Sequence, residues 1–269
     1  MKAFFGENKM QLHRVPKEDV AEVFADAGIQ IHFGGHMHIN DTGVRTSKAG
    51  NTLFNIQTPS LAAYAPGYKV LTILSETDFD VETVIINKAK NFNSLFPLYE
   101  QEYAYLSETN YSTIWNKDIL TTENYKDFTK FHLKELVRLR FLPSDWPKRF
   151  AESFLTTSGK DLLLNNSTSP ELLNAHLLAN NLTLEAFETW TGFDMVHDFY
   201  KLRSADQLAF SDIGENRLMA YQFICEELKD ITDEKLKLWL RIFEKSRKGA
   251  PSNHFRIDLE ADSIKNITP

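Results

Sequence analysis

The chain has 269 residues, 42% of them hydrophobic and 25% charged, a composition that excludes a disordered or fibrous protein. Its formal charge of -7 would repel a phosphate backbone, so we do not expect nucleic acid as a partner. The single cysteine, Cys225, excludes an intramolecular disulfide framework and a cysteine-rich zinc module. We find no membrane-spanning run and no secretory signal in residues 1–9, so we expect a soluble chain of unknown compartment without a membrane partner.

The first part of the chain reads as a helix, a short strand and then a sheet. Residues 16–27 carry apolar side chains at helical spacing and are followed by Gly28, which suits a left-handed stop. Residues 29–33 are short and β-prone, and they lead into the glycine pair Gly34 and Gly35. Further strands are predicted at residues 52–56, 68–74 and 81–86.

After the predicted sheet the pattern becomes mainly helical. Residues 86–112 show no clear periodicity and are predicted to be a connecting region on the surface. Ser169 before Pro170, and Asp233 before Glu234, are typical helix starts. Helices are expected at residues 123–140, after Ser169, at 218–228 and after Asp233, and a last strand is expected at 254–259. Cys225 falls on the apolar face of its helix and is expected in a core.

The residues that suggest chemistry are His36 and His38, directly after the predicted strand and the glycine pair. In an extended backbone, side chains two residues apart project to the same face, so both imidazoles would point into one site. Imidazole is a common ligand for transition metals. A His-x-His pattern also arises by chance in surface loops, and that alternative stays open on spacing alone.

With Gly35 and Met37 these histidines form Gly-His-x-His, which resembles the last signature motif of the calcineurin-like metallophosphoesterases. The resemblance covers roughly residues 1–90, including the helix and strand before the motif and the strands after it. It implies a two-metal site (Mn, Fe or Zn) in which His36 and His38 bind different metals and a bridging hydroxide attacks a small phosphorylated substrate.

The family pattern also requires Asp-x-His, Gly-Asp and Gly-Asn-His motifs upstream, and this chain lacks them. The simplest interpretation is that the chain is the C-terminal part of a longer enzyme, which puts catalysis by this chain alone in doubt. His13 lies upstream but does not match a family motif, and we interpret it as a loop residue. A core that lacks its first strands would expose a sheet edge, so we expect a homo-oligomer or pairing with a missing N-terminal segment.

The expected fold is therefore α+β: the C-terminal part of a calcineurin-like phosphoesterase β-sandwich in residues 1–112, a helical accessory domain in 113–250, and a terminal strand and tail in 251–269. Near the motif, Asn40 and Asp41 are candidates for orienting the histidines, although turn formation explains them equally well. Tyr64 and Tyr68 are candidates for a substrate loop, and a turn with packed rings is the alternative.

Two functions from different classes remain. The first is a metal-dependent phosphoester hydrolase as the parent activity, with His36 and His38 as metal ligands and weak or no activity in this chain alone. The second is a non-catalytic binding or assembly module that retains Gly-His-x-His as a relic. The other histidines, His132, His176, His197 and His254, have no ligand spacing to one another and are expected to be structural or exposed.

Overall fold

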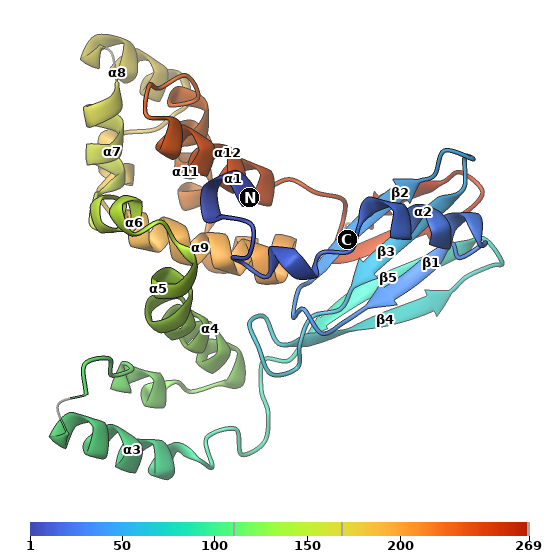
Figure 1. Ribbon diagram of the computed structural model, residues 1–269, viewed down its shortest axis with the longest axis horizontal. Helices are drawn as coiled ribbons and strands as arrows, with labels where there is room; N and C mark the ends of the chain where they lie inside the picture. The colour runs from blue at the N-terminus through green and yellow to red at the C-terminus, as the bar shows by residue number, and fades with distance from the viewer. Residues whose placement is uncertain (110, 168, 268–269) are drawn as a thin grey trace. The chain divides into compact units, whose positions relative to one another are not determined.

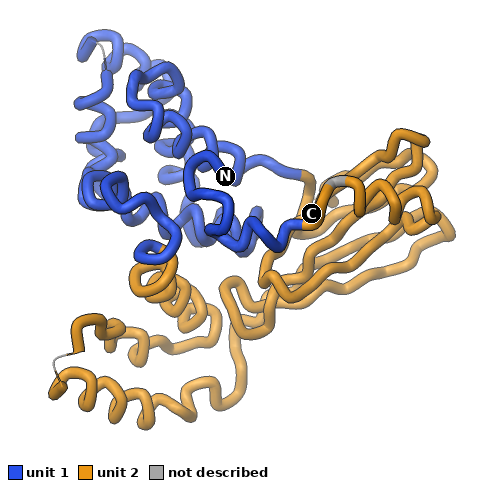
Figure 2. The backbone as a smooth tube through the Cα atoms, in the orientation of Figure 1, with its two compact units in different colours: residues 1–15, 142–249 blue, residues 16–141, 250–269 orange. Residues whose placement is uncertain are grey.

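The computed structural model describes residues 1–109, 111–167 and 169–267, and it is mixed α/β, with 50% helix and 16% strand (Figure 1). This confirms the α+β prediction at that level. The chain forms two compact units: unit 1 comprises Met1–Val15 and Leu142–Gly249, and unit 2 comprises Pro16–Phe141 and Ala250–Pro269 (Figure 2). These boundaries differ from the predicted segments 1–112, 113–250 and 251–269, the last of which ends in residues 268–269, outside the described part.

Unit 2 holds the sheets. Its strands are β1 (Ile31–Gly34), β2 (Asp41–Thr46), β3 (Thr52–Gln57), β4 (Gly67–Ile73), β5 (Asp78–Ile85), β6 (His254–Asp258) and β7 (Ser263–Asn266). Its helical segments are α2 (Glu18–Asp26), α3 (Phe96–Glu108), the 3-10 turn Lys117–Thr121, α4 (Tyr125–Leu136) and the π-helical turn Val137–Phe141. The predicted helix at 16–27 and the predicted strands at 29–33, 52–56, 68–74, 81–86 and 254–259 are confirmed to within a few residues.

The strands form two sheets that share one hydrophobic core. In the first sheet, of order β1-β3-β2, β1 runs parallel to β3 and β2 antiparallel to it. The second sheet has the order β4-β5-β6-β7 and is antiparallel throughout. The fully buried side chains of Phe54 and Ile56 from the first sheet pack in one cluster with those of Val81, Phe255 and Ile257 from the second. Burial of these alternate positions makes the pair of sheets a sandwich.

One edge of the sandwich leaves apolar side chains exposed. β1 and β4 are terminal strands of their sheets. Phe33 pairs with core residue Ile56, and Leu71 pairs with core residue Val81, so both side chains belong to the core-facing sides. Nevertheless Phe33 and Leu71 are each 39% exposed, and Ile73, which shares the face of Leu71, is 69% exposed. The described residues do not cover this edge of the sandwich.

The region expected to be a connecting segment on the surface contains helix α3, which was not predicted, although the helix does lie at the surface. Periodicity failed because α3 has no buried residue in the described part, and its apolar side chains Leu98 and Tyr105 are exposed at 58% and 66%. The helix is held by aromatic contacts, such as that of the Phe96 and Phe128 rings, whose centroids lie 5.5 Å apart. Strand β2 was also missed, since its first residue, Asp41, was considered only as a turn residue or as a residue that orients the histidines.

Unit 1 is helical and has an aromatic core. Its helices are α1 (Lys2–Phe5), α5 (Leu142–Asp145), α6 (Lys148–Phe154), α7 (Gly159–Asn166), α8 (Pro170–Ala179), α9 (Gly192–Ala205), α10 (Phe210–Ile213), α11 (Glu215–Glu227) and α12 (Glu234–Ser246). Short 3-10 turns lie at Leu12–Arg14, Leu184–Phe187 and Asp206–Ala209.

Both predicted helix starts in unit 1 are confirmed. The Ser169 side chain accepts a hydrogen bond from the N–H of Leu172, and the Asp233 carboxylate accepts from the N–H groups of Lys235 and Leu236. Cys225 is 5% exposed, as expected of a core residue. In the described part of the chain, no helix is long and apolar enough to cross a bilayer.

Candidate metal site

The Gly-His-x-His segment is a tight loop at the end of β1. The N–H and the hydroxyl of Thr58, just after β3, both donate to the Gly34 carbonyl at 2.8 Å and fix the end of the strand. A Cβ atom at position 34 would lie 2.5 Å from Nε2 of Gln57, so a side chain there would require the Gln57 side chain to move. Glycine therefore leaves room for Gln57 where the loop begins.

The two histidines do not have the extended backbone that the sequence argument assumed. The Met37 N–H donates to the Gly35 carbonyl at 2.8 Å, which closes a turn over three residues. His36 and His38 have φ angles of 70° and 55°, in the left-handed region, and both are exposed. Non-glycine residues adopt this region at a cost, and such residues concentrate at functional sites. The two imidazoles lie in one exposed loop. The prediction that an extended backbone would point both of them to the same face was wrong, because this loop is a turn.

Asn40 ends the loop in a buried polar network. It is 0% exposed, and its side-chain oxygen accepts hydrogen bonds from the Lys69 ammonium at 2.7 Å and the Thr83 hydroxyl at 3.3 Å. Its amide group donates to the Ser252 carbonyl at 3.3 Å. The Lys69 ammonium also donates to the Thr83 hydroxyl and the Ser252 carbonyl, both at 2.8 Å. These contacts fix the histidine loop to β4, to β5 and to the segment before β6.

Asp41 begins β2 directly after this network. Its carboxylate accepts a hydrogen bond from the Thr42 N–H at 2.8 Å. Asp41 is exposed as a whole, but nearby protein atoms partly desolvate its carboxyl group. This desolvation raises the pKa of Asp41 above its ordinary value. The Thr42 hydrogen bond and the positive charge of Lys69 oppose the rise in pKa. Asp41 is therefore a strand residue that directly follows Asn40 of the charged network.

The remaining candidates are dispersed. Tyr64 is 3% exposed and lies before β4, whereas Tyr68, the second residue of β4, is 46% exposed. His13 belongs to unit 1, and His32 lies in β1 with its Nδ1 atom 2.8 Å from Oδ1 of Asn55. Among the candidates, His36, His38, Asn40 and Asp41 lie together because they are neighbours in the sequence.

The imidazoles of His36 and His38 suit the nitrogen positions of a transition-metal site, but they do not complete one. Within residues 1–109, 111–167 and 169–267, no group of three or more His, Cys, Asp or Glu side chains is placed to hold a metal ion. Mononuclear sites normally need at least three protein ligands, and a dinuclear site needs more. The two residues therefore fit part of the donor set that the resemblance implies.

Sequence reasoning missed the role of Lys69. The lysine stands between Tyr68 and Val70 in a β-prone run, so the alternation of β4 places it on the side of Leu71, which faces the sandwich core. A lysine at an inward position of a strand requires buried acceptors, and this was the signal that could have indicated the network.

The comparisons with known proteins add no assignment. No protein-family model matches the chain, and no curated protein matches it significantly.

Proposed function

We propose that this chain contributes the histidine pair of a divalent-metal site in a phosphoester hydrolase of the calcineurin-like type. His36 and His38 would each bind a metal ion through an imidazole nitrogen. The remaining ligands of a two-metal centre would come from groups that are not gathered around this loop in the described residues. The substrate would be a small phosphorylated molecule, in keeping with the acidic net charge.

The observation that supports this proposal is the backbone of the histidine loop. Two exposed histidines hold left-handed φ angles within three residues, on a turn fixed by Gly34 and Thr58. Non-glycine residues cost roughly 1–3 kcal/mol each in this region, although histidine, like asparagine and aspartate, occupies it more often than other side chains do. The two histidines therefore carry some folding cost, which ligand binding would offset.

Bound divalent metals would supply positive charge for a phosphoryl group and lower the pKa of bound water. The chain's own part would be to hold the loop in place. The hydrogen bonds of Asn40 to Lys69, Thr83 and Ser252 fix the residue two positions after His38. Because a loop with one end buried loses less entropy when it binds a metal, this network would favour binding.

Metal binding is tested with Mn²⁺ as the probe, by paramagnetic broadening of the histidine ring signals in an NMR spectrum. We expect the rings of His36 and His38 to broaden at the lowest Mn²⁺ concentrations. The His36→Ala variant should reduce broadening at His38, and the reverse variant should reduce it at His36. His13→Ala is the matched control, since His13 is also exposed but lies in unit 1, and it should change neither signal.

Hydrolysis of an aryl phosphate with added Mn²⁺ is the second measurement. Turnover that falls in His36→Ala and His38→Ala but not in His13→Ala would support the hydrolase. Selective metal binding without turnover by this chain alone fits an incomplete two-metal centre. If turnover were still absent from a longer chain that supplies the missing ligand motifs, the alternative, a non-catalytic binding module that retains the motif, would be favoured. Equal broadening of all three rings, with no turnover, would refute both.

A further inference from the structure

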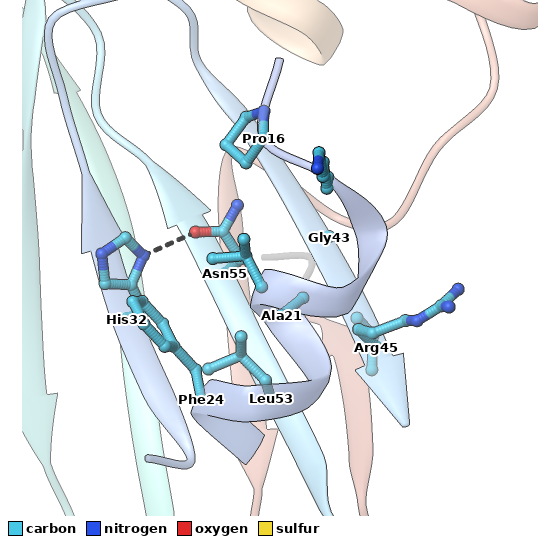
Figure 3. A pocket seen from close by; sticks show the side chains of 11 residues that line it. Pro16, Ala21, Phe24, His32, Gly43, Arg45, Leu53 and Asn55 are labelled. Carbon is cyan, nitrogen blue, oxygen red and sulfur yellow. Dashed lines mark hydrogen bonds between the residues drawn. The ribbon is translucent and has the colours of Figure 1, made fainter. Parts of the chain in front are cut away.

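A hollow of about 330 Å³ lies in unit 2 between helix α2 and the side of the β1-β3-β2 sheet that faces away from the sandwich core (Figure 3). Ala21 and Phe24 of the helix and Leu53 of β3 form apolar walls, while His32 and Asn55 bring polar atoms to it. Sites for small ligands combine apolar walls with a few convergent polar groups in this way. The hollow is separate from the histidine loop.

The hollow exists because a glycine occupies the sheet position under the helix. Strand pairing places His32, Asn55 and Gly43 in one row across the three strands. A Cβ atom at Gly43 would have no heavy atom within 4 Å, and its φ is not in the left-handed region. The backbone therefore does not require glycine at position 43, and a side chain there would occupy free space.

Asn55 presents a hydrogen-bond donor to the hollow. Its side-chain oxygen lies 2.8 Å from Nδ1 of His32 and accepts a hydrogen bond from Nε2 of Gln57 at 3.3 Å. Both contacts use the oxygen, which orients the amide so that its nitrogen lies on the side away from His32 (Figure 3). The NH2 group can therefore donate to an acceptor on a ligand.

The charges that line the hollow favour a single negative charge. The Arg45 guanidinium, which lines the hollow, donates to the Glu22 carboxylate at 3.0 Å, so Glu22 offsets the charge of Arg45. Lys17 adds a further positive charge to the lining. A monoanion would balance the charge of Lys17, whereas a dianion would carry one negative charge more than Lys17 offsets.

From these features we infer that the hollow binds a small monocarboxylate with a compact apolar body. The ligand carboxylate accepts hydrogen bonds from the Asn55 amide and is attracted by the positive charge of Lys17. The apolar body of the ligand packs between Phe24 and Leu53. Charge-assisted hydrogen bonds are stronger than neutral ones, which distinguishes a carboxylate from its neutral amide. The inference does not depend on the metal site.

Benzoate is the probe, titrated into the full chain and followed by chemical-shift changes of the backbone amides. We expect saturable shifts confined to α2, β1, β2 and β3, with benzamide binding at least tenfold more weakly. Gly43→Val should abolish binding while keeping or raising the melting temperature, because valine fills the hollow and suits a strand better than glycine.

Asn55→Asp should weaken benzoate binding at least tenfold, since it replaces the donor by a second negative charge. Asn266→Asp is the matched control: it adds the same charge at an exposed position of β7 in the same unit and should leave binding unchanged. Three results would overturn the inference: no saturable benzoate shifts, shifts outside the named elements, or equal binding by the wild-type chain and Gly43→Val. Equal weakening by both aspartate variants would also contradict it, because it would mean that net charge and not Asn55 controls binding.

Discussion

The substitution Asn40→Ala tests whether the buried network holds the sandwich together around the histidine loop. It removes one acceptor of the Lys69 ammonium, at 2.7 Å, and the donor to the Ser252 carbonyl at 3.3 Å, while the ammonium keeps the Thr83 hydroxyl and the Ser252 carbonyl. A hydrogen bond to a charged group contributes roughly 1.5–3 kcal/mol and a neutral one roughly 0.5–1.5 kcal/mol. Thr83 keeps an acceptor at Ser252, 3.2 Å away, so its loss is small. We expect unit 2 to lose about 3 kcal/mol of stability.

Hydrogen exchange measures this loss within unit 2, where a melting temperature would mix the two units. Amides of β4 and β5 should exchange roughly 100-fold faster in Asn40→Ala, since each 1.4 kcal/mol changes an equilibrium constant tenfold. Asn266→Ala, at an exposed strand position, should change the free energy of opening that hydrogen exchange reports by no more than about 0.5 kcal/mol.

A double-mutant cycle with Lys69→Met separates the network from simple loss of volume. If Asn40 acts through the ammonium, then Asn40→Ala should cost about 2 kcal/mol less in the Lys69→Met background. Additive effects, or an acceleration below about fivefold in Asn40→Ala alone, would refute the reasoning.

Three further predictions concern separate features. Burial raises the pKa of the Cys225 thiol to about 12, so alkylation of the native protein should be slow, should rise about tenfold per pH unit between pH 7 and 9 without levelling off, and should become fast in denaturant. The uncovered edge with Phe33, Leu71 and Ile73 should associate with a second copy of the chain, so light scattering should show a larger mass for the wild-type chain than for Ile73→Lys. The control Val23→Lys, at an exposed position of α2, should leave the wild-type mass unchanged. A wild-type monomer at high concentration would count against this edge. Asp233→Ala removes the cap of α12 and should cost about 1 kcal/mol in chemical unfolding; a loss below 0.3 kcal/mol would show that the capping bonds contribute little.

Local sequence signals predicted the elements whose residues obey one clear periodicity or have a clear stop. Helix α2 precedes Gly28, and the starts of α8 and α12 carry Ser169 and Asp233 as caps, so each was predicted within a few residues. Helix α3 has no buried face among the described residues, so its sequence has no helical stripe to detect. Tertiary contacts by a few aromatic rings define it instead.

The sequence predicted which residues form the candidate site but not their backbone conformation or their long-range contacts. Gly35, His36 and His38 can be recognised in the sequence, yet the sequence did not predict the left-handed φ angles of the two histidines, of which His36 lies inside the turn closed between Gly35 and Met37. The partners of Asn40 lie far along the chain: Ser252 is 212 residues away. Local patterns carry no information about such contacts, and only the pairing of β5 with β6 creates them.

The left-handed backbone at His36 and His38 also sets a limit on how this chain can be engineered. A redesign that maximised thermal stability would choose glycine or asparagine at both positions, because these residues accept that backbone with less strain. Such a redesign would strengthen the fold and remove both imidazoles in the same step. In this loop, stability and ligand chemistry therefore oppose each other at the same two residues.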